Sequence, residues 1–447
     1  MGERFCDFEE RYEVHFERGT RSVSSQAQQY MQGLMQADRK NMERMEEVVP
    51  DCNYQSLHHF LSDSEWDARA VLDQVAREAD HHLGGSEDSA LLLDESAFAK
   101  KGEKSVGVAR QWSGRLGKVD NCQVAVFACL AKRQSSTLID TRLYLPREWT
   151  NDPARCKKAG VPQHEAVFRS KADLAFEMVL RARRNGVRFN WVGVDGGYGK
   201  EPFFLRRLED HGEVFVAEVH KDQQVYVEDP APRLPEKTST RGRKPIRLEA
   251  QTASLRVDEW VKAQPEEHWQ TVTVRPGTKG QIRVEALRAR VWLWNGVEPK
   301  ARHWHLVATR ELGSRGTIKY TLSNAPEETL LKRLVQMQRQ RFWIERSFED
   351  AKSESGMADY QVRGWLAWHH HMALVTMAML FMLEEKFVHK QKYPLLSCSD
   401  IEILLSHLLP RRGVTAKEVV CQMEARHRAR QAAIDSAYRR QGLCEAE

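Results

Sequence analysis

Between residues 90 and 219 the hydrophobic pattern is that of strands alternating with helices, and this pattern constrains the fold more than any other feature of the chain. Short apolar runs and amphipathic stretches follow one another in the order strand, strand, strand, helix, strand, helix, strand. These segments are 90–93, 122–130, 137–145, 170–184, 189–194, 202–210 and 214–219. We expect the first three strands to form a meander, and the whole order is typical of an α/β domain with a mixed sheet.

Helical and β-rich segments flank this pattern. Residues 26–48 predict one helix, and two short helices before residue 83 resemble a helix-turn-helix, although a plain helical bundle leaves the same pattern. A proline-rich linker at 228–245 precedes alternating segments that predict a β-rich insertion. Asn324 marks the start of a helix that continues through Phe348, and a second, apolar helix follows.

The length of 447 residues leaves room for several modules at about 150 residues per domain. Five segments are expected. They are a helical DNA-binding domain at 1–85, the first part of the α/β core at 86–225, a β-rich insertion at 226–325, the last core helices at 326–390, and a helical, basic C-terminal region at 391–447.

Charge and cysteine content narrow the function classes. The chain has 68 Lys and Arg against 63 Asp and Glu, a net charge of +5 that permits a polyanionic partner. Its 8 cysteines show no C-x-x-C spacing, which argues against a disulfide framework and against a zinc site. The apolar run 372–383 is too short to span a bilayer and no signal peptide is visible, so we expect a cytoplasmic protein without membrane insertion.

Three acidic residues are candidate metal ligands. Asp94 and Asp195 each follow an apolar strand pattern, and Glu345 lies on the helix after the insertion. An ionised carboxylate is costly to bury without a cation beside it. Oxygen donors from two strands and a helix can hold two divalent ions about 4 Å apart, an arrangement that performs in-line phosphoryl transfer on nucleic acids.

Each acid also has a simpler interpretation. An aspartate at the end of a strand is more often a turn or a helix cap, and a glutamate on a charged helix is more often a solvated ion-pair partner. The catalytic hypothesis gains strength from order, because the acids fall on the first strand, on the fourth strand and on the helix after the insertion.

This order resembles the ribonuclease H-like core of the DDE transposases of bacterial insertion sequences. Several blocks carry the resemblance, which covers residues from about 35 to 390. The blocks are 39–45, 59–62, 93–102, 105–111, 117–124, 343–352, 359–363 and 365–371. The family implies an α/β, ribonuclease H-like mixed sheet with a β-rich insertion and helical N- and C-terminal regions.

The glutamate block also resembles a signature of cut-and-paste members of this family, a tyrosine, an arginine, a glutamate and a lysine at fixed helical spacing. Arg341, Glu345 and Lys352 stand at the last three places, whereas Gln338 stands where tyrosine is expected. The resemblance implies that Asp94, Asp195 and Glu345 are catalytic metal ligands, and that Arg341 and Lys352 position phosphate near the scissile bond.

Further basic and aromatic residues are candidates for DNA contact. A hairpin beside Asp94 carries Lys100, Lys101, Lys104 and Arg110, which are expected to grip backbone phosphates unless the hairpin is merely solvated. Arg241 and Arg243 could enter a narrow minor groove, although a solvated linker is the simpler interpretation. Trp292 and Trp294 share one face of a predicted strand, and Trp294 could stack on a flipped base or simply pack. The run His369-His370-His371 cannot share one ion, since consecutive helical residues point in different directions, and is assigned to packing and phosphate contacts.

The resemblance implies a transposase that binds the terminal inverted repeats of its element, cleaves the ends and joins them to target DNA. Two Mg²⁺ ions, replaceable by Mn²⁺, would be its cofactors. Its partners would be double-stranded DNA and a second copy of the chain in a paired-end complex, in a bacterial cytoplasm close to the nucleoid. Two alternatives stay open, a catalytically inactive repressor or scaffold and a stand-alone nuclease of the same fold.

Overall fold

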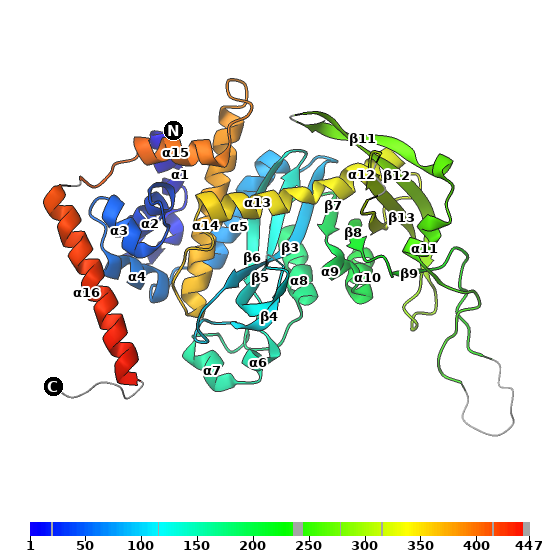
Figure 1. The fold of residues 1–447 in the computed structure, drawn as a ribbon, viewed down its shortest axis with the longest axis horizontal. Helices are drawn as coiled ribbons and strands as arrows, with labels where there is room; N and C mark the ends of the chain where they lie inside the picture. The colour runs from blue at the N-terminus through cyan, green and yellow to red at the C-terminus, as the bar shows by residue number, and fades with distance from the viewer. Residues whose placement is uncertain are drawn as a thin grey trace.

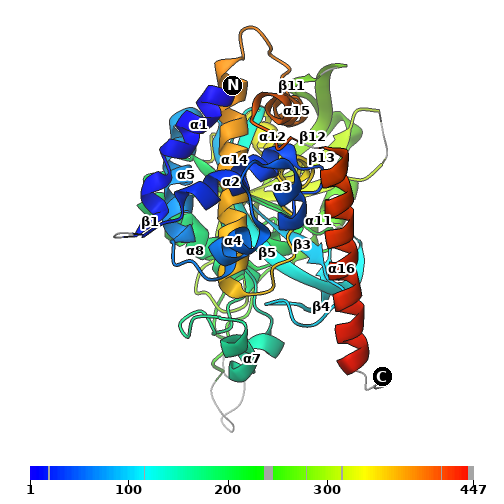
Figure 2. The same cartoon turned by 90° about the vertical axis from the view of Figure 1, so that its left-hand side faces the viewer.

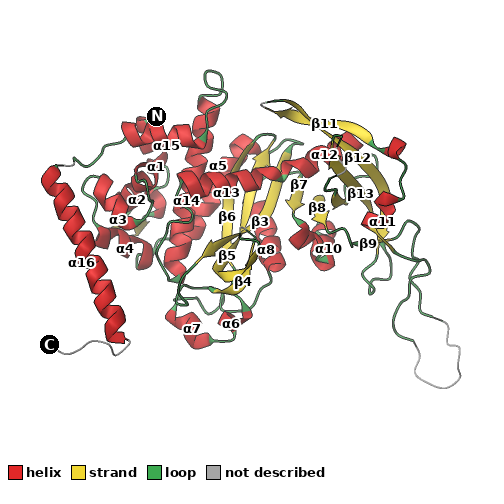
Figure 3. Ribbon diagram, viewed as in Figure 1, coloured by secondary structure: helices red, strands yellow, loops and turns green. Residues whose placement is uncertain are grey.

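A mixed sheet of ten strands forms the centre of the described part of the molecule (Figures 1 and 3). The computed structural model describes residues 1–18, 21–114, 116–235, 245–277, 279–313, 316–413 and 415–440. In Figure 3 helices gather at the N-terminal side, strands and helices alternate in the middle, and strands dominate at the far end. The predicted fold class, a ribonuclease H-like α/β sheet with a β-rich insertion and helical N- and C-terminal regions, is confirmed.

The central strands follow the predicted order, apart from the strand over residues 109–113, which the sequence did not predict. They are β3 (Ser89–Ala99), β4 (Ala109–Ser113), β5 (Lys118–Lys132), β6 (Ser135–Leu143), β7 (Trp191–Val194) and β8 (Phe215–Val219). β5 pairs antiparallel with β3, β4 and β6, whereas β7 runs parallel to both β3 and β8. Between them lie α6 (Arg147–Thr150), α7 (Pro153–Lys158), α8 (Lys171–Arg184), α9 (Gly196–Gly199) and α10 (Pro202–Asp210).

One strand is longer than the sequence indicates. The apolar run predicts a strand that ends at Asp94, but β3 continues to Ala99, because the residues from Asp94 onward keep their pairing with β5, with Asp94 opposite Phe127 and Ala99 opposite Cys122. Asp94 therefore lies in the middle of a strand, where the ladder fixes its backbone.

Among the described residues, the four longer strands of the insertion belong to the core sheet, and its two shortest strands pair with each other in a small separate sheet. The elements of the insertion are β9 (Gln224–Val225), β10 (Leu255–Arg256), α11 (Val257–Lys262), β11 (Gln270–Gly277), β12 (Gly280–Leu293), β13 (Arg302–Glu311) and β14 (Lys319–Ser323). β14 pairs antiparallel with β8, with Leu322 opposite Ala217, so β11 to β14 extend the core sheet. A small second cluster of apolar side chains, including Val274, Val284 and Val335, packs beneath α12 (Leu331–Gln340).

The N-terminal helices share one hydrophobic core with the sheet. They are α1 (Gly2–Glu10), α2 (Ser24–Gln36), α3 (Met42–Val48), α4 (Tyr54–Ser62) and α5 (Ala68–Leu83). Between α1 and α2 lie two antiparallel strands of two residues each, β1 (Glu17–Arg18) and β2 (Arg21–Ser22). The single helix predicted for 26–48 is two helices. The chain turns extended at Ala37, and Asn41 then caps α3 by accepting the Arg44 backbone N–H.

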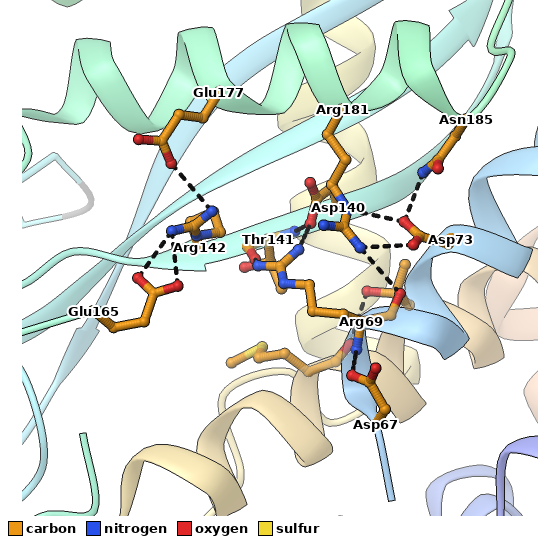
Figure 4. Close-up of polar contacts among 12 residues, drawn as sticks. Asp67, Arg69, Asp73, Asp140, Thr141, Arg142, Glu165, Glu177, Arg181 and Asn185 are labelled. Atoms are coloured by element: carbon orange, nitrogen blue, oxygen red, sulfur yellow. Dashed lines mark hydrogen bonds and ion pairs between the residues drawn. The ribbon is translucent and has the colours of Figure 1, made fainter. Parts of the chain in front are cut away.

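A network of ion pairs fastens α5 to the sheet and to α8 (Figure 4). Arg69 of α5 contacts Asp140 of β6 and donates to the Thr141 carbonyl oxygen at 2.7 Å. Arg181 of α8 forms a bidentate pair with Asp73 of α5, at 2.8 and 2.7 Å. Because these pairs join segments far apart in sequence, they lock the helical region onto the core.

The C-terminal quarter, from residue 342 onward, is helical. It comprises α13 (Phe342–Glu354), α14 (Trp365–Val388), α15 (Cys398–Leu408) and α16 (Ala416–Arg440). α14 is long and apolar enough to cross a membrane, but 94% of its most apolar window is buried inside the protein, as in a core helix. The basic helix α16 stands at one side of the molecule (Figure 2), and Arg426 ties it to Glu47 of α3 at 2.6 Å.

The helix predicted to begin at Asn324 begins later. Asn324 is not a helix cap, because its side chain accepts the Phe215 backbone N–H at 2.7 Å and donates to the Glu213 carbonyl oxygen at 2.9 Å. The helix starts at Leu331, and it is divided at Arg341 into α12 and α13. That division sets the direction in which the Arg341 side chain leaves the helix.

Candidate active site

Three adjacent parallel strands carry an acidic residue at the same level. β3 and β7 are in register with Leu93 opposite Val194, so the next residues, Asp94 and Asp195, leave the two strands side by side. β7 and β8 are in register with Val194 opposite Ala217, which places Glu218 on the other side of Asp195. The sheet thus presents a row of three carboxylates.

Local hydrogen bonds orient the two aspartates. Asp94 Oδ1 accepts the Glu95 backbone N–H at 2.7 Å. Asp195 caps α9, and its Oδ1 accepts the backbone N–H groups of Gly197 at 2.9 Å and Tyr198 at 3.3 Å. The short helix can lie directly on β8 because residue 199 is glycine, since a Cβ there would come within 1.8 Å of the Glu218 carbonyl oxygen.

Arg341, at the junction of α12 and α13, is the cation of this site. Its Nη1 donates to Asp94 Oδ2 at 3.3 Å, and its Nη2 donates to Glu345 Oε1 at 2.5 Å. Its Nε lies 3.3 Å from Glu218 Oε1, an ion pair without the geometry of a hydrogen bond. One guanidinium therefore joins the row of acids on the sheet to the glutamate on α13.

The acids crowd one another electrostatically. Burial, followed by the charge of Asp195, raises the pKa of Asp94 to about 7, although Arg341 acts in the opposite direction. Burial lowers the pKa of Arg341, but the charges of Glu218, Glu345 and Asp94 more than offset it, so the net shift is upward. The site holds more negative charge than its arginine neutralises, which is the electrostatic setting that attracts a cation.

The carboxylate oxygens of this site suit a hard divalent ion, although the three proposed ligands are not close enough together to bind one ion. Mg²⁺ and similar ions prefer carboxylate oxygens, and Asp94 and Asp195 supply them from one edge of the sheet. Among the described residues, however, no three His, Cys, Asp or Glu side chains are close enough to hold one ion. Arg341 stands between the row on the sheet and Glu345, whose side chain is 51% exposed and free to turn.

The remaining predicted contact residues are spread over the surface. Lys352 is half-buried on α13, with its ammonium 5.7 Å from the centroid of the Phe348 ring. Lys101, Lys104 and Arg110 are exposed, and Lys100 lies over the ring of Tyr360. Arg241 and Arg243 lie outside the described residues.

Two tryptophans of the insertion have intramolecular partners. β12 ends at Leu293, so Trp292 lies on this strand and Trp294 lies beyond it. Trp292 stacks on His303 with ring centroids 4.2 Å apart, and Trp294 donates through Nε1 to the Glu298 carbonyl oxygen at 2.8 Å.

Two further sequence positions have structural explanations. Gln338, which replaces the tyrosine of the family signature, is buried between two threonines, accepting from Thr309 at 2.8 Å and donating to Thr321 at 2.6 Å. The histidine run on α14 packs in the core as predicted. The prediction that His370 and His371 contact phosphate is wrong, because neither side chain has any exposed surface.

Glu218 is the functional candidate that the sequence did not reveal. Glu218 lies inside the apolar run 214–219, one residue before the end of the strand. Asp94 and Asp195, by contrast, come directly after their apolar runs. An acid inside an apolar run was the available signal, but a single acid in a five-residue strand is common on half-exposed sheets.

A mixed sheet with acids side by side on adjacent parallel strands, faced by an arginine and a glutamate from a later helix, is the arrangement that the sequence led us to expect of a DDE nuclease. The model of the DDE superfamily endonucleases matches residues 12–281, and the chain belongs to this family. The match includes Asp94, Asp195 and Glu218 and ends before α13. The chain is also 23% identical, over 331 residues, to a probable transposase for insertion sequence element IS701 from Microchaete diplosiphon, covering 72% of this chain and 73% of that protein.

Proposed function

We propose that this protein is the transposase of a bacterial insertion sequence, which cleaves the ends of its element and joins them to target DNA. The observation that carries the proposal is the alignment of Asp94 and Asp195 on neighbouring strands, with Arg341 linking Asp94 to Glu345. The family match and the similarity to an insertion-sequence transposase support it.

Asp94, Asp195 and Glu345 would hold two Mg²⁺ ions, or Mn²⁺ in their place. Bound there, the ions supply the activation of a water or 3′-hydroxyl nucleophile and the stabilisation of the leaving oxygen. Glu345 must first leave Arg341, and its exposed side chain, one helical turn after that arginine, is placed to do so.

Arg341 then has a second task. With ions held by the acids, Arg341 would keep Glu218 as its ion-pair partner, and its other N–H groups would be available to a phosphate oxygen near the scissile bond. Lys352, about two turns after Glu345 on α13, would contact the same strand. Fixed donors of this kind favour the charge that develops during phosphoryl transfer.

The remaining parts of the protein would serve DNA recognition. The helical segment 1–85 would bind the terminal inverted repeats. The insertion at 226–325 would shape the cleaved end, and the basic tail lies at 391–447. The segments 86–225 and 326–390 would form the catalytic core. Lys100, Lys101, Lys104, Arg110, Arg241, Arg243 and Trp294 are proposed DNA contacts. The active form would be a homodimer holding both ends of the element, in the cytoplasm at the nucleoid.

The test is cleavage and strand transfer on the genomic DNA that flanks the gene, with Mg²⁺ added or withheld. The Asp195→Asn variant keeps the hydrogen bonds that cap α9 and removes only the charge, so it should bind this DNA and fail to cut it. Asp7→Asn, at an exposed position on α1, is the matched control and should cut normally.

Three results would reject parts of the proposal. Cutting by Asp195→Asn at the wild-type rate would remove this residue from the site. Binding of DNA without cleavage by the wild type would identify an inactive repressor or scaffold. Cleavage without joined product from precut ends would identify a stand-alone nuclease.

A further inference from the structure

A groove of about 1270 Å³ lies between the N-terminal helices and the core, away from the row of acids. The connection from β3 to β4 forms one wall, and α4 contributes Tyr54 and His58 to the opposite wall. The end of α7 and the segment that leads into α14 close the groove, and Figure 1 shows α4, the start of α14 and β4 along the same edge of the molecule. Its volume exceeds that of a typical small-molecule pocket.

The lining of the groove is strongly basic. Five cationic side chains line it and Glu103 is the one acid among the lining residues. The cations are Lys100, Lys101, Lys104, Lys158 and Arg363. All except Lys100 are exposed, and in the part of the chain that the structure describes no carboxylate forms an ion pair with any of them. A concave surface with such a charge balance fits a polyanion.

Lys100 differs from the other four because the protein fixes it in place. Its Nζ lies 3.6 Å from the centroid of the Tyr360 ring. Tyr360 is itself locked, since its hydroxyl donates to Gln123 at 2.8 Å and accepts from Trp368 at 3.3 Å. The Asn121 side chain holds the backbone of Lys100 by donating to its carbonyl oxygen at 2.7 Å.

The environment of Lys100 supplies no negative charge. Besides Tyr360, its titratable neighbour is His371, which is buried and uncharged at neutral pH. Burial lowers the pKa of Lys100 to about 8. A partly desolvated cation that is held still and lacks an anion gains more from a phosphate than a solvated lysine does, because little entropy remains to be lost on binding.

The distance from the acids suits a DNA duplex. β3 runs without interruption from Asp94 to Ala99, and Lys100 is the next residue. At about 3.3 Å per residue, the strand separates Lys100 from Asp94 by about 20 Å. Along B-form DNA, with about 3.4 Å per base pair, this span corresponds to about six base pairs.

We propose that this groove binds the phosphate backbone of duplex DNA about six base pairs from the scissile phosphate, with Lys100 as its fixed contact. Lys101, Lys104, Lys158 and Arg363 add solvated contacts around it, and α4 faces the duplex from the other side. The inference rests on the proposed function, and it assigns the flanking duplex, rather than the cleaved strand, to a surface shared by the helical region and the core.

The test measures DNA affinity against salt concentration. A fluorescent duplex of about 30 base pairs, taken from the genomic DNA that flanks the gene, is titrated with the full-length protein at several NaCl concentrations. Each lost phosphate contact lowers the slope of log K against log salt by about 0.9. Lys100→Met keeps the apolar stem over Tyr360 and should lower the slope by about one, and Lys100→Arg should restore it.

Two controls separate the groove from general charge. The double variant Lys101→Ala/Lys104→Ala should lower the slope by up to about two, whereas Lys332→Ala/Lys390→Ala, which removes two exposed lysines outside the groove, on α12 and just after α14, should leave it unchanged. On a duplex cut back to about four base pairs on the groove side, Lys100→Met and the wild type should bind equally. Thermal melting verifies that each variant is folded.

The outcomes distinguish this inference from the proposed function. An unchanged slope for folded Lys100→Met, with wild-type binding and cleavage intact, overturns the groove and leaves the transposase standing. A persistent difference between the two proteins on the shortened duplex overturns the assigned position. Absence of DNA binding and cleavage by the wild type overturns the function itself.

Discussion

Two clusters of charged side chains lie on the same sheet, and they are balanced in opposite ways. In the network that joins α5, β6 and α8, part of which Figure 4 shows, four arginines form ion pairs with four carboxylates. Its pairs connect Arg69, Arg142, Arg169 and Arg181 with Asp73, Asp140, Glu165 and Glu177. At the candidate active site the acids outnumber the cations around them, because Arg341 faces Asp94, Asp195, Glu218 and Glu345, and among the described residues Lys319 and Arg339 add positive charge near Glu218.

This difference teaches what separates a structural cluster from a functional one. A balanced network is complete as it stands and holds two segments together. An unbalanced cluster is completed by a ligand of the missing charge. The surplus of carboxylates at Arg341, rather than the presence of buried charge, is therefore the feature that points to divalent ions.

Removing one surplus acid should have the largest effect and should separate activity from stability. Asp94→Asn removes a metal ligand, so cleavage of element ends should fall by about a thousandfold, equal to about 4 kcal/mol of activation free energy. The metal-free variant should unfold at the same temperature as the wild type or higher, because a crowded negative charge is gone. Cleavage rates and calorimetric melting check both parts, and a large loss of stability would show that Asp94 is structural.

The opposite result is expected in the balanced network. Asp140→Asn leaves Arg69 without its carboxylate partner in a largely buried position, where breaking an ion pair is costly. We expect the free energy of unfolding to fall by about 2–3 kcal/mol, less than for a fully buried pair because Arg69 is partly exposed. Chemical denaturation measures this loss. Divalent-ion binding by the folded variant should be unchanged, and weakened binding would contradict the separation of the two clusters.

Between about pH 6.5 and 4.5, the acid sensitivity of the protein should come from buried histidines of α14 rather than from either cluster. The pKa of His370 is lowered to about 4 and that of His371 to about 3, mainly by burial, so both stay neutral in the fold and take up protons on unfolding. The contribution of these two histidines to stability should then be constant above about pH 6.5 and fall as pH drops below it, by up to about 1.4 kcal/mol per pH unit for each histidine. His371→Gln should flatten the fall between pH 6.5 and 4.5, and an unchanged slope would exclude this histidine as a source.

The smallest effect is expected at Glu218. Glu218→Gln weakens the hold on Arg341 without touching a proposed metal ligand, so cleavage should fall by about tenfold. DNA affinity and melting temperature should stay close to those of the wild type. Lys319→Ala, which removes the lysine paired with Glu218, is the control and should leave the cleavage rate almost unchanged. Equal losses in both variants would mean that Glu218 acts through general charge.

Much of this arrangement was visible in the sequence. The apolar runs before Asp94 and Asp195 identified the strands and the acids, because β strands with buried faces carry long hydrophobic runs. The position of Glu345 and Arg341 on one helix face followed from the family signature. What local pattern cannot supply is distance, and so the role of Arg341 as counterion to four carboxylates emerged only from the fold.

Pairing between distant segments was the other part that could not be predicted. β14 joins β8 across about a hundred residues, and nothing in either strand alone specifies that register. Asn324 had the pattern of a helix start, but its side chain instead accepts a hydrogen bond from the backbone N–H of Phe215 on β8. Glu218 was missed for the same reason, since its neighbours on β7 and on α12 and α13 come from other parts of the chain.

The central claim, that the surplus carboxylates gather divalent ions, is tested most directly by titrating metal-free protein with Mn²⁺ and following the free ion by electron paramagnetic resonance. We predict that the wild type and Asp7→Asn each take up two ions per chain, and that Asp94→Asn and Asp195→Asn each lose this uptake while remaining folded. Equal Mn²⁺ binding by all four proteins, or none by the wild type, would contradict the account.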